Sequence, residues 1–144
     1  MNWDERFVGL AKFVGSWSKD RSRKTGAVIV GPGNEVRSLG FNGFPRKVND
    51  SVDARHERPA KYKWTEHAER NAIYNAARSG TSTLDCRMYS DWYPCMDCAR
   101  AIIQAGISKL ICKEPDWNDP IWAKDFAEVP TMLEEGGVQV VFVK

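Results

Sequence analysis

The chain has 144 residues, which fits one domain and allows one sizeable hydrophobic core. Lysine and arginine number 21 against 19 aspartates and glutamates, and this net charge of +2 argues against a general polyanion binder. No run of about 18 apolar residues occurs, and Met1–Arg6 lacks the apolar segment of a signal peptide, so we expect a cytoplasmic protein without membrane association.

The first half of the chain predicts one helix, a hairpin and a loop. Apolar residues at helical spacing predict a helix over Phe7–Trp17. Two short apolar runs, Gly26–Val30 and Val36–Phe41, flank the turn formers Gly31–Asn34 and predict a β-hairpin. The segment Asn42–Trp64 is rich in Pro, Gly, Asp and Arg, so we expect a long ordered loop, a kind of segment that is usually functional.

The second half of the chain alternates helices with strands. The expected helices are Thr65–Arg78 with Thr65 as N-cap, Pro94–Ala105, and a last helix within Ile121–Glu135 that is interrupted or started at Pro130. The expected strands are Arg87–Ser90, Lys109–Lys113 and Val138–Val143. This alternation predicts parallel crossovers. We therefore expect a single α/β domain over residues 1–144, with a five-stranded mixed sheet and helices on both faces.

Two short motifs carry the chemistry, and each opens a predicted helix. They are His67–Glu69 and Pro94–Cys98. A catalytic zinc site uses three nitrogen or sulfur ligands and leaves the fourth position to water, and His67, Cys95 and Cys98 can supply three. Helix N-termini favour thiolates, and zinc lowers the pKa of bound water from 15.7 to about 7. The two motifs together predict a catalytic zinc site.

Glu69 stands two residues beyond His67, where it cannot readily share the same metal ion. It is better placed to relay protons, because deamination must deprotonate water and protonate both the ring N3 and the leaving amine. The pattern H-x-E followed by P-C-x-x-C is the signature of zinc deaminases acting on nucleobases.

Two other interpretations of these motifs remain. The C-x-x-C pair can be a redox couple, which leaves His67 and Glu69 unexplained. The site can also be a closed, non-catalytic zinc module whose fourth ligand is Cys86, Cys112 or His56. We favour the catalytic site, because Cys86 and Cys112 are better explained as small buried thiols.

With these motifs in place, the sequence resembles the deoxycytidylate (dCMP) deaminases of the cytidine deaminase-like superfamily. The resemblance covers most of the chain and includes the segments Ser18–Asp20, Gly26–Val30, Gly40–Pro45, Lys61–Tyr62, His67–Ile73 and Cys98–Ile107. It implies a three-layer α/β/α fold, one catalytic Zn²⁺, and hydrolysis of dCMP to dUMP and ammonia, a step that feeds thymidylate synthesis.

The resemblance also implies roles for single residues. His67, Cys95 and Cys98 would bind zinc, and Glu69 would shuttle protons. The implied substrate contacts are Asn42 at the sugar or phosphate end, the backbone amide of Ala68 at the base, Ser18 and Lys24 near the phosphate, and Tyr93 and Trp117 at the pocket.

A monophosphate carries nearly two negative charges, so nearby basic side chains are reasonable neighbours for it. The candidates are Arg21, Arg23, Lys24, Arg46 and Lys47, although most lysines and arginines are simply solvated. Asp91 and Trp117 depart from the family's usual residues and leave the choice of substrate open, including 5-substituted dCMP.

Other substrates and partners follow from the same resemblance. A nucleoside is one alternative substrate. A base in transfer RNA or single-stranded DNA is another, but it needs a basic groove with stacking aromatics, which the near-neutral charge disfavours. Many relatives are hexamers that dCTP activates and dTTP inhibits. The resemblance therefore implies a homo-oligomer and triphosphate effectors with Mg²⁺.

Overall fold

A five-stranded mixed sheet forms the centre of the protein in the computed structural model, which describes residues 1–144. The strand order is β2-β1-β3-β4-β5, and β1 is antiparallel to both of its neighbours, whereas β3, β4 and β5 are parallel. The strands are β1 (Gly26–Val30), β2 (Val36–Phe41), β3 (Arg87–Ser90), β4 (Lys109–Lys113) and β5 (Gln139–Val143). The predicted hairpin and parallel crossovers are confirmed.

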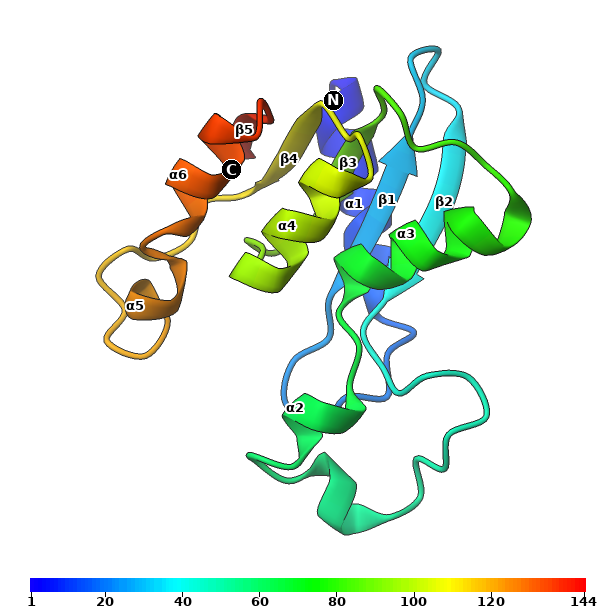
Figure 1. Ribbon diagram of the computed structural model, residues 1–144, viewed down its shortest axis with the longest axis vertical. Coiled ribbons are helices and arrows are strands. Elements are labelled where there is room, and N and C mark those ends of the chain that lie inside the picture. The colour runs from blue at the N-terminus through cyan, green and yellow to red at the C-terminus, as the bar shows by residue number, and fades with distance from the viewer.

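Helices cover both faces of this sheet (Figure 1). The elements are α1 (Trp3–Gly15), the 3₁₀ turn η1 (Asp53–His56), α2 (Lys61–Trp64), α3 (Ala68–Ser79), α4 (Met96–Gln104), α5 (Ala123–Phe126) and α6 (Val129–Glu135). Helix α1 packs on one face, and α3, α4 and α6 pack on the other. This arrangement confirms the predicted α/β fold class. No helix is both long and apolar enough to span a membrane.

Strand β1 shows why the sheet needs helices on both sides. All five of its residues are buried, as expected for a central strand covered on both faces. Ala27 and Ile29 join the larger apolar cluster beneath α3, α4 and α6, whereas Val28 and Val30 face α1. The period-two alternation of the strand therefore supplies two cores from one run of apolar residues.

Helix α3 begins three residues later than predicted. Its N-cap is His67, whereas Thr65 is the C-cap of α2. The reason is a pairing between distant segments, in which Gly43 and Glu66 exchange backbone hydrogen bonds of 3.0 and 2.8 Å. This bridge holds the chain extended just before His67. Helix α3 therefore starts after His67, and Glu69 lies in its first turn.

Two further predictions of local structure were incomplete. The segment Asn42–Trp64 was expected to be a loop, but it contains η1 and α2. The Phe44 ring stacks on His56 within it, with ring centroids 4.8 Å apart. The last helix is divided into α5 and α6, and Pro130 lies in the first turn of α6. That position tolerates proline because the first turn has no intrahelical partner for its amides.

Candidate active site

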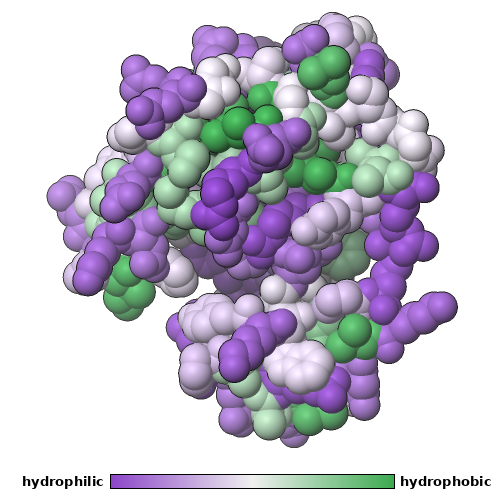
Figure 2. Space-filling view, in the orientation of Figure 1, coloured by the Kyte–Doolittle hydropathy of each residue, from purple (hydrophilic) through white to green (hydrophobic).

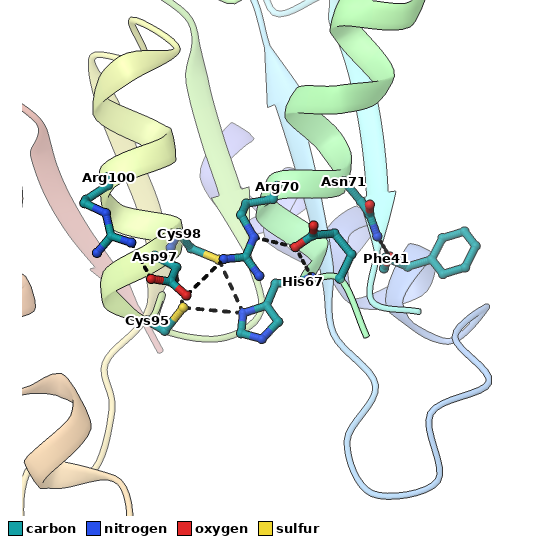
Figure 3. Close-up of polar contacts among 9 residues, drawn as sticks. Phe41, His67, Arg70, Asn71, Cys95, Asp97, Cys98 and Arg100 are labelled. Atoms are coloured by element: carbon teal, nitrogen blue, oxygen red, sulfur yellow. Dashed lines mark hydrogen bonds and ion pairs between the residues drawn. The ribbon is translucent and has the colours of Figure 1, made fainter. Parts of the chain in front are cut away.

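The N-termini of α3 and α4 converge and bring together three side chains that could hold a metal ion (Figure 3). His67 is the N-cap of α3, Cys95 is the N-cap of α4, and Cys98 lies in the first turn of α4. Their ligand atoms all lie within 4.8 Å of one another, and His67 Nδ1 is 3.4 Å from each Sγ. One imidazole and two thiol groups match the donor set of a zinc site with an open position.

The local sequence explains this placement of the two cysteines. Cys95 has extended backbone dihedrals, and its Sγ accepts a hydrogen bond of 3.4 Å from the backbone N–H of Cys98. The sulfur thus occupies the position that a serine or aspartate oxygen takes at an ordinary N-cap. Because residues three apart lie on the same side of a helix, Cys98 faces the same point in space.

Hydrogen bonding within this cluster shifts the pKa values of its members. The bond from Cys98 and then the bond from His67 lower the pKa of Cys95 to about 4. The pKa of Cys98 is raised, first because it shares its proton with the Cys95 sulfur and then because it is buried. The bond to Cys95 raises the pKa of His67. Since metal ligands must be deprotonated, binding of an ion by these atoms releases protons.

Glu69 lies on the first turn of α3 and is almost completely buried, yet it contributes to the wall of the adjoining cavity. Burial raises the pKa of its carboxyl group above the ordinary value. A carboxyl group with a raised pKa is suited to accept and return a proton near neutral pH. Glu69 is not part of the cluster of metal-binding atoms.

An ion-paired side chain holds the two helix starts in place (Figure 3). Arg70 of α3 contacts the Glu66 carboxylate through Nε and the Asp97 carboxylate of α4 through Nη1, at 3.4 Å for the second pair. The same Glu66 oxygen accepts the backbone N–H of His67 at 3.1 Å. This chain of contacts fixes the orientation of α3 relative to the first turn of α4.

The cluster opens into a cavity of about 480 Å³. Figure 2 shows a hollow between the main body of the protein and the part formed by η1 and α2, with hydrophilic side chains along it. The residues that line the cavity include His67, Glu69 and Cys95 together with Asp20, Arg23, Asn42, Arg58, Lys61, Trp92, Tyr93, Trp122, Asp125 and Phe126. The cavity is therefore polar at the metal-binding cluster and aromatic along another wall.

A nearly buried ion pair joins two loops at this cavity. Lys61 Nζ lies 3.2 Å from Asp20 Oδ1, and their side chains are only 11% and 8% exposed. The same oxygen accepts the backbone N–H groups of Ser22 and Arg23. Burial raises the pKa of Asp20, but these hydrogen bonds and Lys61 outweigh it and lower the pKa overall. The charge of Lys61 is therefore balanced within the protein.

The predicted substrate contacts separate into three groups. Asn42 and Tyr93 line the cavity. Ser18 and Ala68 are buried and do not line it. Lys24 is exposed outside it, and Trp117 lies instead on a second depression beside β5, which it shares with Tyr93.

Asn42 and Ser18 support the backbone next to the cavity. The Asn42 side chain accepts the N–H of Thr25 at 2.9 Å and donates to the carbonyl of Arg23 at 2.8 Å. One amide hydrogen and one lone pair remain free for a ligand. Ser18 Oγ donates to the Asn42 carbonyl at 2.7 Å and accepts the N–H of Asp20. Asp91 accepts the N–H of Gly26 at 3.0 Å.

Several cavity residues were not predicted as site residues from the sequence. Trp92, Trp122 and Lys61 reach the cavity from three separate segments. Arg23 was one of five basic residues suggested as neighbours of a phosphate group. It is the only one of those five that lines the cavity. The pair Lys61–Tyr62 within the resemblance was the available signal, whereas nothing local marked the two tryptophans.

The fold and the donor set define a class of protein, the zinc-dependent hydrolytic deaminases with a cytidine deaminase-like fold. Residues 1–114 match the profile of the cytidine and deoxycytidylate deaminase zinc-binding region. The chain belongs to this family, and the resemblance stated from the sequence is confirmed.

Individual relatives show how far the similarity extends. The chain is 42% identical over 143 residues to an uncharacterized deaminase in the luxG 3′ region of Aliivibrio fischeri, covering 98% of this chain and 93% of that protein. It is 36% identical over 124 residues to the human deoxycytidylate deaminase, covering 83% and 68% of the two chains. The crystal structure of the cyanophage S-TIM5 dCMP deaminase with dCMP and dUMP has the same fold, with a TM-score of 0.78, 23% identity, and coverage of 96% and 95%.

Proposed function

We propose that this protein catalyses the zinc-dependent hydrolytic deamination of dCMP to dUMP and ammonia. The observation that carries the proposal is the His67, Cys95 and Cys98 cluster beside the buried Glu69, at the wall of one cavity. The relatives at 36% and 46% identity are deoxycytidylate deaminases from human and phage T4, and they supply the choice of substrate.

In this proposal His67, Cys95 and Cys98 hold a zinc ion. When bound, zinc activates a water molecule and stabilises charge that develops during the reaction. His67 and Cys95 would place the bound zinc at the wall of the cavity, and the Arg70 contacts hold the starts of α3 and α4 together.

Glu69 moves the protons of the reaction. Its carboxylate takes a proton from the attacking water and delivers it to N3 of the cytosine ring. Once the bond between C4 and the water oxygen has formed, Glu69 takes the remaining proton from that oxygen and delivers it to the amino nitrogen. The bond from C4 to the amino nitrogen then breaks, ammonia leaves, and C4 keeps the oxygen as a carbonyl group. Burial raises the pKa of Glu69, which makes its carboxyl group a better proton acceptor than an exposed carboxylate.

The substrate preference is tested by ammonia release from four compounds with the zinc-loaded protein. They are dCMP, deoxycytidine, dCTP and CMP. Turnover of dCMP at least about tenfold above the others supports the proposal, because a remote phosphate group can supply binding energy for the reacting carbon. A preference for deoxycytidine, or turnover of oligonucleotide in its place, would contradict it.

We further propose a cytoplasmic homo-oligomer with dCTP and dTTP effectors, as the family resemblance implies. Three exposed aromatic side chains, Phe13, Trp17 and Phe41, lie edge-to-face in series on one surface and support association of subunits. Light scattering of the pure protein tests the oligomer. Addition of dCTP or dTTP with Mg²⁺ to the dCMP assay tests the effectors, and unchanged rates would contradict them.

A further inference from the structure

Arg23 lines the cavity, and its guanidinium group has no anionic partner in the protein. Its Nη1 atom is the one buried side-chain nitrogen or oxygen in the protein that has no hydrogen-bond partner in the chain. No carboxylate lies within ion-pair distance of its guanidinium group, whereas Lys61 in the same cavity is paired with Asp20. A buried donor without an acceptor is costly, so its retention calls for an explanation.

The backbone at Arg23 is fixed from two sides. Asp20 Oδ1 accepts the Arg23 N–H at 3.0 Å, and Asn42 Nδ2 donates to the Arg23 carbonyl at 2.8 Å. Both partners are buried or nearly so. The direction in which the side chain leaves the backbone is therefore set by the fold before any ligand arrives.

Two tryptophan rings then hold the guanidinium group. Its central carbon lies 3.7 Å from the centroid of the Trp92 ring and 5.1 Å from that of Trp122. Contact of a guanidinium plane with an aromatic face leaves the N–H edges available, because those hydrogens lie in the plane of the group. The side chain is thus oriented in advance, and little rotamer freedom remains to be lost when a ligand binds.

The other basic candidates near this site do not share these features, and Arg58, which also lines the cavity, is exposed. Arg21 pairs with Asp53 at 3.0 Å, and Arg46 donates to Asn75 at 2.6 Å, both on the exposed surface. Lys24 and Lys47 are exposed and do not line the cavity. Arg23 is the only one of the five that lies in the same cavity as the metal-binding cluster.

We infer that Arg23 is the residue by which this enzyme selects a 5′-phosphorylated substrate, through hydrogen bonds from its guanidinium edge to the phosphate oxygens. A planar fork of N–H donors matches the spacing of phosphate oxygens, and the doubly charged group supplies the missing anion. Trp92 and Trp122 act through Arg23 as positioning residues. This inference rests on the proposed function and assigns the selectivity to one side chain.

The test compares the zinc-loaded wild-type enzyme with Arg23→Met and with the matched control Arg21→Met. Methionine keeps an unbranched apolar stem that can pack on the two tryptophan rings. For each protein, kcat/KM is measured with dCMP and with deoxycytidine, and zinc content and melting temperature are recorded. Loss of a charged hydrogen-bonding partner is expected to lower kcat/KM for dCMP by about 100-fold in Arg23→Met.

The selectivity, more than the rate, decides the outcome. In Arg23→Met the value for deoxycytidine is expected to stay within about threefold of wild type, so the preference for the phosphorylated substrate collapses. Arg21→Met is expected to keep both values. An equal loss on both substrates would show that Arg23 acts only on structure, and an unchanged preference would show that another group binds the phosphate; either result overturns the inference.

A second variant and a second readout cover the case in which Arg23→Met does not fold. Arg23→Lys keeps the charge but loses the planar fork, so it is expected to weaken dUMP binding by about tenfold in calorimetry. Unchanged dUMP affinity in Arg23→Lys would contradict the inference. Wild-type enzyme that fails to turn over dCMP contradicts the proposed function, whereas dCMP turnover with undiminished phosphate selectivity in the variants contradicts only the role of Arg23.

Discussion

Gly40 of β2 allows the backbone of α3 to pack closely against the strand, and this packing sets the position of the active-site residues at the start of α3. A Cβ atom at Gly40 would lie 2.3 Å from the backbone nitrogen of Ala72 and 2.5 Å from the carbonyl oxygen of Ala68. Ordinary contact begins at 3.4 Å, so Gly40→Ala must push α3 away by about 1 Å. Both obstructing atoms belong to helix backbone, which cannot rotate out of the way as a side chain can.

The size of the effect follows from this clash. Overpacking of a close-packed interior typically costs about 1–3 kcal/mol, and we expect the upper end because α3 is also tied to β2 by hydrogen bonds. Ser38 Oγ donates to the Ala72 carbonyl at 2.6 Å, and Asn75 Nδ2 donates to the Leu39 carbonyl at 2.7 Å. A displacement of about 1 Å at reacting groups can cost about 100-fold in rate, and α3 carries both His67 and Glu69.

Urea unfolding, zinc content and ammonia release from dCMP measure these effects together. Gly40→Ala is expected to lose about 3 kcal/mol of unfolding free energy and about 100-fold of kcat. Gly43→Ala is the matched control, because a Cβ there meets nothing within 4 Å. If Gly40→Ala kept the wild-type stability within about 0.5 kcal/mol and full activity, the close approach of β2 and α3 would not set the site geometry.

Three further predictions concern the proposed zinc ligands and the proposed proton carrier, Glu69. Glu69→Gln should keep the fold and the zinc but lose about 10³-fold in kcat, since general acid–base groups contribute about 10²–10⁴-fold; wild-type-like turnover with bound zinc would remove Glu69 from the proton relay. Cys98→Ser should lose most of its zinc by atomic absorption, whereas Cys112→Ser, which alters a buried thiol outside the cluster, should keep it. In metal-free protein, iodoacetamide should modify Cys95 at a nearly constant rate from about pH 8 to 5, because its pKa of about 4 keeps the thiolate populated. Burial raises the pKa of Cys112 to about 12, so mass spectrometry should find it unmodified; a Cys95 rate that falls tenfold per pH unit below pH 8 would contradict the lowered pKa.

The features that could be predicted from the sequence are those that depend on residues close together in the chain. The spacing of Cys95 and Cys98 predicts that their sulfur atoms lie on one side of α4, because residues three apart share a helix face. The position of His67 beside them depends in addition on the convergence of α3 and α4. The strands were recognisable because β1 and β4 are short buried apolar runs between turn formers and helices.

The remaining features depend on contacts between distant segments. The start of α3 is set by the Gly43–Glu66 bridge, which no local pattern reveals. Arg23 meets Trp92 and Trp122 only because the turn before β1, the end of β3 and the segment before α5 converge. Lys24, the neighbour of Arg23 in the chain, was the more direct prediction from the resemblance, yet it is exposed outside the cavity.

Zinc-dependent release of ammonia from dCMP is the most direct test of the proposed activity. The wild-type protein would be assayed as purified with zinc, after removal of zinc by a chelator, and after zinc is restored. We predict steady turnover of dCMP to dUMP, loss of that turnover in parallel with the zinc content, and recovery at one zinc ion per chain. Turnover that persists without zinc, or a folded protein with one zinc ion per chain that releases no ammonia from dCMP, would contradict the proposed function.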